Sequence, residues 1–277
     1  MMRFGGTMTL NGLIWTVATS FDKILLGRYW GPDVTGIYYN GSQLSRIPID
    51  NLNSALGDVA FSALSRLQDE PERFKRYFLK GYTLIVALTL PIAVVCAVFA
   101  DDLITALLGP KWVGAVEIFR ILAATILVFA ILNPLGWLLN ALGLVERGLK
   151  IAMASAPLLI MGYVVGLPYG PRGVALAYST VMTLGLVPLA VWAVHGTPIG
   201  IRDMVRVLSR PLASSAVAAA FAFGIHVLYG LYGAELSLLP RLLSEMFVFG
   251  ATYLIVLLFV AGQKSFYLDI LRGVRAD

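Results

Sequence analysis

Apolar residues gather in eight long stretches along the chain, and short polar segments separate them. Six of the stretches have the length and hydropathy of membrane-spanning helices. The first is less regular, because Asn11, Thr19 and Ser20 interrupt it, and the second is only weakly apolar. Proline and glycine punctuate the connecting segments, as turns require. We therefore predict eight membrane-spanning helices, at Thr7–Leu26, Gly36–Leu64, Gly81–Phe99, Val116–Asn140, Ile151–Gly166, Gly173–Val194, Pro211–Tyr229 and Leu242–Val260.

The second predicted span carries a stripe of polar side chains. As one helix it would be about 44 Å long at 1.5 Å per residue, which is enough to cross a bilayer with tilt. A polar helix face among very apolar segments is typical of a helix that lines a water-filled cavity. The stripe follows helical spacing and consists of Tyr39, Gln43, Arg46, Asp50 and Asn53.

The composition agrees with a membrane protein. Of the 277 residues, 58% are hydrophobic and only 13% are charged, and the mean hydropathy is +0.81. Soluble domains carry about 25% charged residues. We therefore predict an all-α fold, a polytopic transmembrane helix bundle. The net charge of +5 does not indicate a nucleic-acid partner, because the excess basic residues of membrane proteins usually lie in cytoplasmic loops.

The basic residues indicate an orientation. With both termini in the cytoplasm, the outer segments hold only Arg28, Lys111, Arg172 and Arg241. The asymmetry follows the positive-inside rule. Lys23, Arg46 and Arg120 lie within or at the ends of spans, and the cytoplasmic segments hold Arg3, Arg66, Arg73, Lys75, Arg76, Lys80, Arg147, Lys150, Arg202, Arg206, Arg210, Lys264, Arg272 and Arg275.

Two amphipathic segments are expected at the membrane surfaces. Before the third span, Asp69 would cap a helix with Pro71 and Glu72 in its first turn. Beyond the third span, residues 101–108 would form a second interfacial helix, which Gly109–Pro110 would end.

No constellation of residues predicts catalysis, a cofactor or a metal site. Cys96 is the only cysteine, and neither histidine lies near it in the sequence. His226 and Glu245 are interpreted as isolated structural residues of the last two spans, and Asp101–Asp102 has no histidine nearby in the sequence. A glycine-rich phosphate loop is also missing, so the sequence does not indicate ATP hydrolysis. We therefore predict a protein that is not an enzyme.

Several short motifs follow one another between residues 3 and 195, and after residue 195 only hydropathy is informative. The motifs are Phe21–Gly31, Thr35–Asn40, Arg46–Pro48, Ala60–Asp69, Pro71–Arg73, Leu107–Trp112, Gly136–Gly143 and Gly170–Tyr178. As a set, they resemble the polysaccharide flippases of the Wzx type, which belong to the multidrug/oligosaccharidyl-lipid/polysaccharide exporter superfamily.

The resemblance implies a particular domain organisation. Such flippases have two lobes of six helices, often followed by two extra helices. Here residues 1–195 would form a lobe of the C-terminal type, and residues 196–277 two additional helices and a cytoplasmic tail. The first lobe would be absent, so the chain would be a truncated product or would pair with another chain. The alternating-access mechanism needs two lobes.

The resemblance also suggests roles for the polar stripe. Arg46 would bind the diphosphate of a polyprenyl-linked sugar, since a guanidinium group matches phosphate oxygens; alternatively, it forms a structural ion pair with Asp50, one turn away. Tyr39, Gln43 and Asn53 would bind sugar hydroxyls or hold helices together. Pro48 could kink the helix, so the sequence does not determine the direction in which the stripe points.

Two further charged residues are expected at the cavity, each with an alternative role. Asp22 would shape the outer mouth or take part in ion coupling, or it would pair with Lys23 or Arg28. Arg120 would be a second phosphate contact that faces Arg46, or an interfacial partner of Glu117.

The sequence therefore favours a protein that flips lipid-linked oligosaccharide or polysaccharide repeat units across the bacterial inner membrane. Its expected partners are polyprenyl-diphosphate-linked oligosaccharide and membrane lipid, with a second lobe or polysaccharide polymerase and export proteins as further candidates. The alternatives are an exporter of another amphiphile, such as a drug or a peptidoglycan lipid precursor, and a membrane fragment or scaffold that transports nothing.

Overall fold

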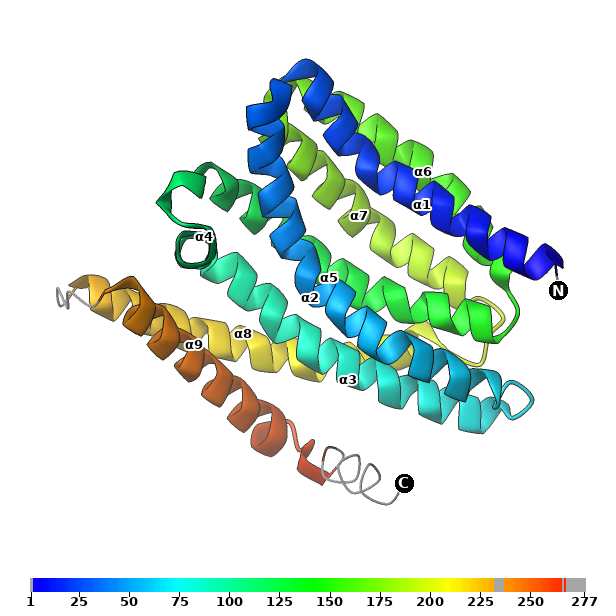
Figure 1. Cartoon of the computed structure of the whole chain (residues 1–277). Helices are drawn as coiled ribbons and strands as arrows, with labels where there is room; N and C mark the ends of the chain where they lie inside the picture. Colours follow the sequence, from blue (N-terminus) through cyan, green and yellow to red (C-terminus); the bar gives the residue numbers. More distant parts are fainter. Residues whose placement is uncertain (1, 232–236, 266, 268–277) are drawn as a thin grey trace.

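The computed structural model of the chain describes residues 2–231, 237–265 and 267, which form helices and turns without a strand (Figure 1). Most of the predicted cytoplasmic tail, including Arg272 and Arg275, lies outside the described residues. The helices are α1 (Met2–Tyr29), α2 (Gly31–Ser65), α3 (Pro71–Val98), α4 (Ala100–Leu108), α5 (Gly114–Ala141), α6 (Val145–Gly166), α7 (Gly170–Val194), α8 (Ile201–Leu231) and α9 (Leu238–Ile255). Single helical turns lie at Pro110–Trp112, Leu167–Tyr169 and Val256–Val260.

Each of the eight predicted spans coincides with one long helix. Five stretches of the described chain are long and apolar enough to cross a membrane, and one of them, Val145–Val194, contains both α6 and α7. The others comprise α3, α5, α8 and α9 with its last turn. The helices α1 and α2 are not among these five stretches, because both contain many polar residues. The prediction of an all-α polytopic helix bundle is confirmed.

The helix α5 lies at the centre of the bundle. It packs against α2, α3 and α7, while α1 packs against α6 on one side and α8 against α9 on the other (Figure 1). In the most apolar part of α5, 61% of the residues are buried, against 22% in α8 and in α9. A helix that is apolar on every side is expected at the centre, and exposed apolar helices at the rim are expected to face lipid.

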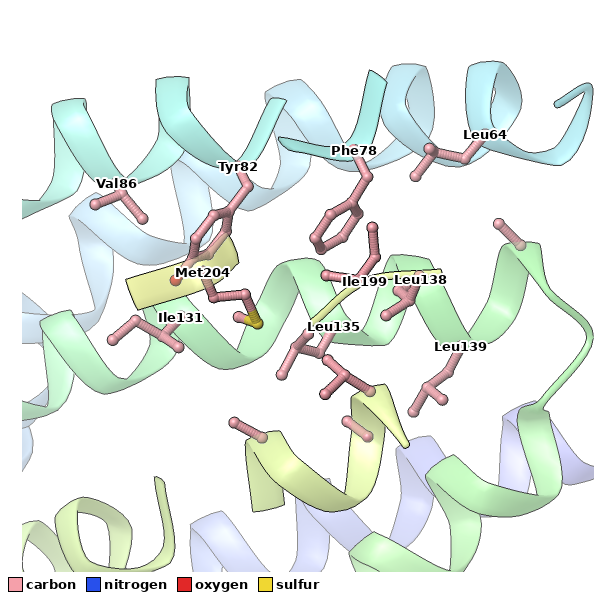
Figure 2. Packing of buried hydrophobic residues seen from close by; sticks show 14 of the residues in the cluster. Leu64, Phe78, Tyr82, Val86, Ile131, Leu135, Leu138, Leu139, Ile199 and Met204 are labelled. Atoms are coloured by element: carbon pink, nitrogen blue, oxygen red, sulfur yellow. The ribbon is translucent and has the colours of Figure 1, made fainter. Parts of the chain in front are cut away.

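Apolar side chains fix the end of α2 against its neighbours. Leu64 of α2, Phe78 and Tyr82 of α3, and Leu135 and Leu138 of α5 belong to one buried cluster, shown in Figure 2. Ile199, just before α8, and Met204, in its first turns, join the same cluster. A second cluster, formed by α1, α2, α5, α6 and α7, holds the other end of α2. Together these contacts determine which side of α2 faces the neighbouring helices.

The two surface segments agree with prediction except at one cap. The short helix α4 covers the predicted interfacial segment, and Gly109 follows it with φ +90°. Asp69, however, is not the cap of α3: that position belongs to Glu70, whose side chain makes no capping hydrogen bond. Pro71 explains the correction, because proline favours the first helical position and so places the cap one residue before itself.

Candidate functional site

A cavity of about 420 Å³ opens between α1, α2, α5, α6 and α7. Three residues of the polar stripe line it, and they are Arg46, Asp50 and Asn53. The helix α1 adds further polar groups, and α5 adds an amide. The additional polar residues are Asn11, Thr16, Thr19 and Asn133. The cavity therefore combines one guanidinium, one carboxylate and several neutral groups that form hydrogen bonds.

The rest of the lining is apolar. Trp15 and Phe129 supply aromatic rings, and Leu132, Leu135 and Ile151 supply aliphatic side chains. Glycine residues of α5 and α6 also line the cavity, so the wall lacks side chains at those positions. Mostly apolar walls with a few polar groups, and a volume of several hundred Å³, are typical of small-molecule sites.

The guanidinium of Arg46 points toward α1. Its Nη2 donates a hydrogen bond to the carbonyl oxygen of Thr19, at 3.3 Å. It also interacts electrostatically with Asp22 and Tyr178, both buried. Ion pairs within the described residues do not include one between Arg46 and Asp50, so the alternative of an Arg46–Asp50 pair is corrected. Helical side chains tilt toward the N-terminus, which takes Arg46 away from Asp50.

Asp22 lies in the protein interior and does not line the cavity. Its side chain is buried, and Oδ2 accepts a hydrogen bond of 2.7 Å from the hydroxyl of Tyr38 on α2. Its Oδ1 accepts another, also 2.7 Å, from the backbone N–H of Lys23. The ammonium group of Lys23 lies over the ring of Tyr39, 5.8 Å from the ring centroid. The expected side-chain partners of Asp22, Lys23 or Arg28, are thus replaced by a tyrosine hydroxyl.

The structure does not bring Tyr39 and Gln43 into the cavity. Both side chains are exposed, whereas the later members of the stripe line the cavity wall. Steps of four and three residues average 3.5 per turn, and such a stripe drifts by about 20° per heptad around a straight helix. Over the 14 residues from Tyr39 to Asn53 the drift reaches about 40°. One stripe in the sequence therefore faces two environments.

Arg120 also lies outside the cavity. Its guanidinium pairs with Asp101 of α4 and donates through Nε to the carbonyl oxygen of Ala97, at 3.3 Å. Glu117 pairs instead with Arg172 of α7, at 2.9 Å. The expected Glu117–Arg120 pair is corrected, because neighbouring helices bring a closer partner to each residue.

Helix α1 also lines the cavity, which the polar stripe of α2 does not predict. Asn11, Trp15 and Thr19 recur every four residues, and this spacing places them on one helix face. The polar residues that weaken the first span are therefore the signal that it lines a cavity. Asn133 was a weaker signal, as one of two amides within an apolar span.

A second pocket, of about 400 Å³, lies at the start of α6. Glu146, Arg147 and Lys150 line it together with Phe4 and Trp192. Gly148 and Ile151 of the same helix line the first cavity. Basic side chains thus stand next to the polar cavity, at the end of the bundle where the positive-inside rule predicts the cytoplasm.

The fold and the cavity define a multi-pass membrane protein with a polar cavity between its helices. The family described as "Polysaccharide biosynthesis protein" matches residues 1–117. Among curated proteins, the chain is similar to the teichuronic acid biosynthesis protein TuaB of Bacillus subtilis (strain 168), with 29% identity over 57% of this chain and 32% of TuaB. It is similar to the lipopolysaccharide biosynthesis protein WzxC of Escherichia coli (strain K12), with 25% identity over 67% of this chain and 38% of WzxC.

A putative O-antigen transporter of Shigella flexneri is 26% identical over 69% of this chain and 43% of its own length. These comparisons confirm the resemblance: the chain is similar to proteins of polysaccharide biosynthesis, among them WzxC, and to a putative O-antigen transporter. The matches span less than half of the length of these relatives.

Solved structures support the fold. The lipid II flippase MurJ, in an inward closed conformation, superposes with a TM-score of 0.72 and 16% identity, over 96% of this chain and 53% of MurJ. A multidrug resistance MATE family transporter in an outward-facing conformation superposes with a TM-score of 0.61 and 17% identity, over 91% and 63% of the two chains. At these identities the likeness concerns the fold alone.

Proposed function

We propose that this chain supplies one lobe of a transporter that moves lipid-linked oligosaccharide or polysaccharide repeat units across the bacterial inner membrane. The observation that carries the proposal is the polar cavity between α1, α2 and α5, with the Arg46 guanidinium in its wall. Sequence similarity to proteins of polysaccharide biosynthesis supports a lipid-linked saccharide as the class of substrate.

Arg46 is proposed to bind the diphosphate. Of the described residues that line the cavity, it alone carries a positive charge. A guanidinium can donate two parallel hydrogen bonds to phosphate oxygens, and these bonds are strong where water is scarce. A guanidinium has five N–H donors, so the hydrogen bond of Arg46 to the Thr19 carbonyl, at 3.3 Å, and its interactions with Asp22 and Tyr178 leave donors for an anion.

The neutral groups are proposed to bind the saccharide. Asn11, Asn53 and Asn133 offer amides that can both donate to and accept from sugar hydroxyls. Trp15 offers an apolar ring for the face of a sugar. The polyprenyl tail would stay in the bilayer, because burying it in a polar cavity gains nothing, and the exposed apolar helices offer it a lipid-like surface.

The basic pocket at the start of α6 is proposed to be the cytoplasmic mouth. Arg147 and Lys150 there would attract the diphosphate before it reaches Arg46. Such an arrangement requires both termini to lie in the cytoplasm. The excess of basic residues in the segments assigned to that side supports this orientation.

The test measures binding of a fluorescent polyprenyl-diphosphate-linked oligosaccharide to the chain in nanodiscs. Arg46→Ala is expected to weaken binding about 10- to 100-fold, because a hydrogen bond to a charged group contributes about 1.5–3 kcal/mol. Arg120→Ala is the matched control, since Arg120 lies outside the cavity, and its affinity should equal that of the wild type.

A competition arm separates the two parts of the substrate. Polyprenyl diphosphate without sugar should compete with the probe by binding Arg46. Its own affinity should therefore be the same for the wild type and for Asn53→Ala. The same Asn53→Ala change should weaken binding of the sugar-bearing lipid. Wild-type protein that does not bind the probe, or Arg46→Ala protein that binds it as well as the wild type, would contradict the proposal.

A further inference from the structure

Three side chains with metal-ligating atoms meet at a place distant in sequence from the cavity residues. Asp102 comes from α4, His226 from α8 and Glu245 from α9, and one ligand atom of each lies within 4.8 Å of the other two. The sequence suggested that His226 and Glu245 are isolated, and that Asp102 has no histidine near it. Tertiary packing corrects both interpretations, because α9 packs against both α4 and α8.

Glu245 is fully buried, and half of its carboxylate has no partner. Oε1 lies 3.0 Å from Nδ1 of His226, whereas Oε2 makes no hydrogen bond although it is inaccessible to solvent. A buried carboxylate oxygen without a partner costs several kcal/mol unless a cation or a donor compensates it. The arrangement therefore indicates a ligand that the three side chains would share.

Asp102 is buried as well, and one of its oxygens is already oriented. Oδ1 accepts a hydrogen bond of 2.5 Å from Nη2 of Arg241, on the same helix as Glu245. Oδ2 is then available to a second positive group. Carboxylates that bind metals are commonly held in this way by a hydrogen bond from outside the coordination sphere.

The charges of the cluster favour a cation. Two carboxylates face one guanidinium and one imidazole, so a neutral His226 leaves one negative charge uncompensated. The ring of His226 stacks on Phe223 of the same helix, with 6.3 Å between ring centroids, and this contact holds its orientation. The side chain of His226 is 44% exposed, whereas that of Glu245 is 0% exposed, so a cation would arrive from the His226 side.

We propose that Asp102, His226 and Glu245 form a binding site for a divalent transition metal of the zinc class. One imidazole nitrogen and two carboxylate oxygens are a donor set that Zn²⁺ uses, and three protein ligands leave a fourth position for water. Neither the resemblance to flippases nor the polar cavity assigns this site, and the proposal does not depend on the function proposed above.

The metal would link the last two helices to the rest of the bundle. At present α9 contacts α3 through the hydroxyl of Tyr253, which donates a hydrogen bond of 2.6 Å to the carbonyl oxygen of Ala87. The pair between Arg241 of α9 and Asp102 of α4 is a second link. The metal would add a third link that also includes α8, and its role would be structural, since it would join α4, α8 and α9 at one point.

The test titrates the purified full chain in detergent with Co²⁺, whose visible absorption reports its coordination. The wild type should bind one Co²⁺ per chain, and Zn²⁺ should displace it. Glu245→Gln and His226→Gln should each weaken Co²⁺ binding more than about tenfold, because loss of a ligand exceeds the effect of losing an outer-shell partner. Asp101→Asn is the matched control, since this neighbouring acid pairs with Arg120 instead, and it should leave the affinity unchanged.

Thermal unfolding provides an independent readout. Zn²⁺ should raise the Tm of the wild type and of Asp101→Asn, and should leave the Tm of His226→Gln unchanged, since a ligand stabilises only the state that binds it. Because His226 is partly exposed, His226→Gln is expected to fold even if Glu245→Gln does not. Absence of Co²⁺ absorption in the wild type would overturn the proposal, and so would binding that survives in both variants.

Discussion

At the scale of single residues, the direction of a side chain determines its partners as much as its position in the sequence does. Arg46 and Asp50 lie one turn apart, yet the arginine reaches back toward α1 and contacts Thr19. Asp22 is likewise held by a residue of the next helix, Tyr38. Asp22 and Arg46 are therefore parts of a junction between α1 and α2. This junction holds Arg46 at the cavity wall.

The Tyr38–Asp22 hydrogen bond is expected to stabilise this junction. Tyr38→Phe removes the donor from a buried carboxylate and should lower the free energy of unfolding by about 1–3 kcal/mol. The measurement is denaturant unfolding in detergent micelles. Tyr39→Phe is the control, because its side chain is 47% exposed, and the change should stay within about 0.5 kcal/mol.

A double variant sharpens this prediction. If the two groups interact, the double variant Tyr38→Phe/Asp22→Asn should lose less free energy of unfolding than the sum of the two single variants. The effects of substitutions at residues in contact are not additive. Additive effects would show that the hydroxyl and the carboxylate act independently.

At the scale of helices, close backbone approach shapes the α6–α7 hairpin. A Cβ atom on Gly173 would overlap the carbonyl group of Gly166, and a Cβ on Gly166 would overlap that of Gly173. Only hydrogen atoms fit between the two backbones. The two glycines lie at the tip of the hairpin, whereas the cavity is lined near the start of α6 and the end of α7. The contact therefore fixes the hairpin without lining the site.

We expect Gly173→Ala to destabilise the chain by about 1–3 kcal/mol or more, because overpacking forces the backbone apart. Gly224→Ala in α8 is the matched control, since a Cβ there meets nothing within 4 Å. Alanine should be neutral or stabilising at that position, by up to about 1 kcal/mol. Equal melting temperatures for the two variants would contradict the close approach seen here.

At the scale of the whole molecule, orientation in the membrane follows from charge. The turn between α2 and α3 holds Arg66 and leads to Arg73, whereas Lys111 follows α4 at the other end of the bundle. If the positive-inside rule holds, the first group faces the cytoplasm.

Cysteine labelling in intact cells tests this orientation. In a Cys96→Ser background, which removes the only native thiol, Lys111→Cys should react with a membrane-impermeant maleimide from outside. Arg73→Cys should react only after the membrane is permeabilised. Both positions are exposed, so accessibility does not distinguish them. The reverse pattern would place the proposed cytoplasmic mouth on the wrong side.

The class of protein and the approximate bounds of its helices could be predicted from the sequence. The free energy of burying apolar side chains in lipid is local and additive, so a hydropathy pattern identifies each span without knowledge of its neighbours. Proline at position 71 and glycine at position 109 mark helix ends for equally local reasons. The sequence also placed Arg46, Asp50 and Asn53 on a polar face, and these three line the cavity.

Only the tertiary structure decided which partner each polar residue meets. Arg120 and Glu117 lie on the same helix yet pair with different helices, and Asp102 meets His226 and Glu245 from far along the chain. Tyr39 and Gln43 share the stripe of Arg46 but not its cavity. Such pairings depend on how helices pack and rotate against one another. Periodicity shows which residues share a face, but the direction of that face depends on contacts between distant segments.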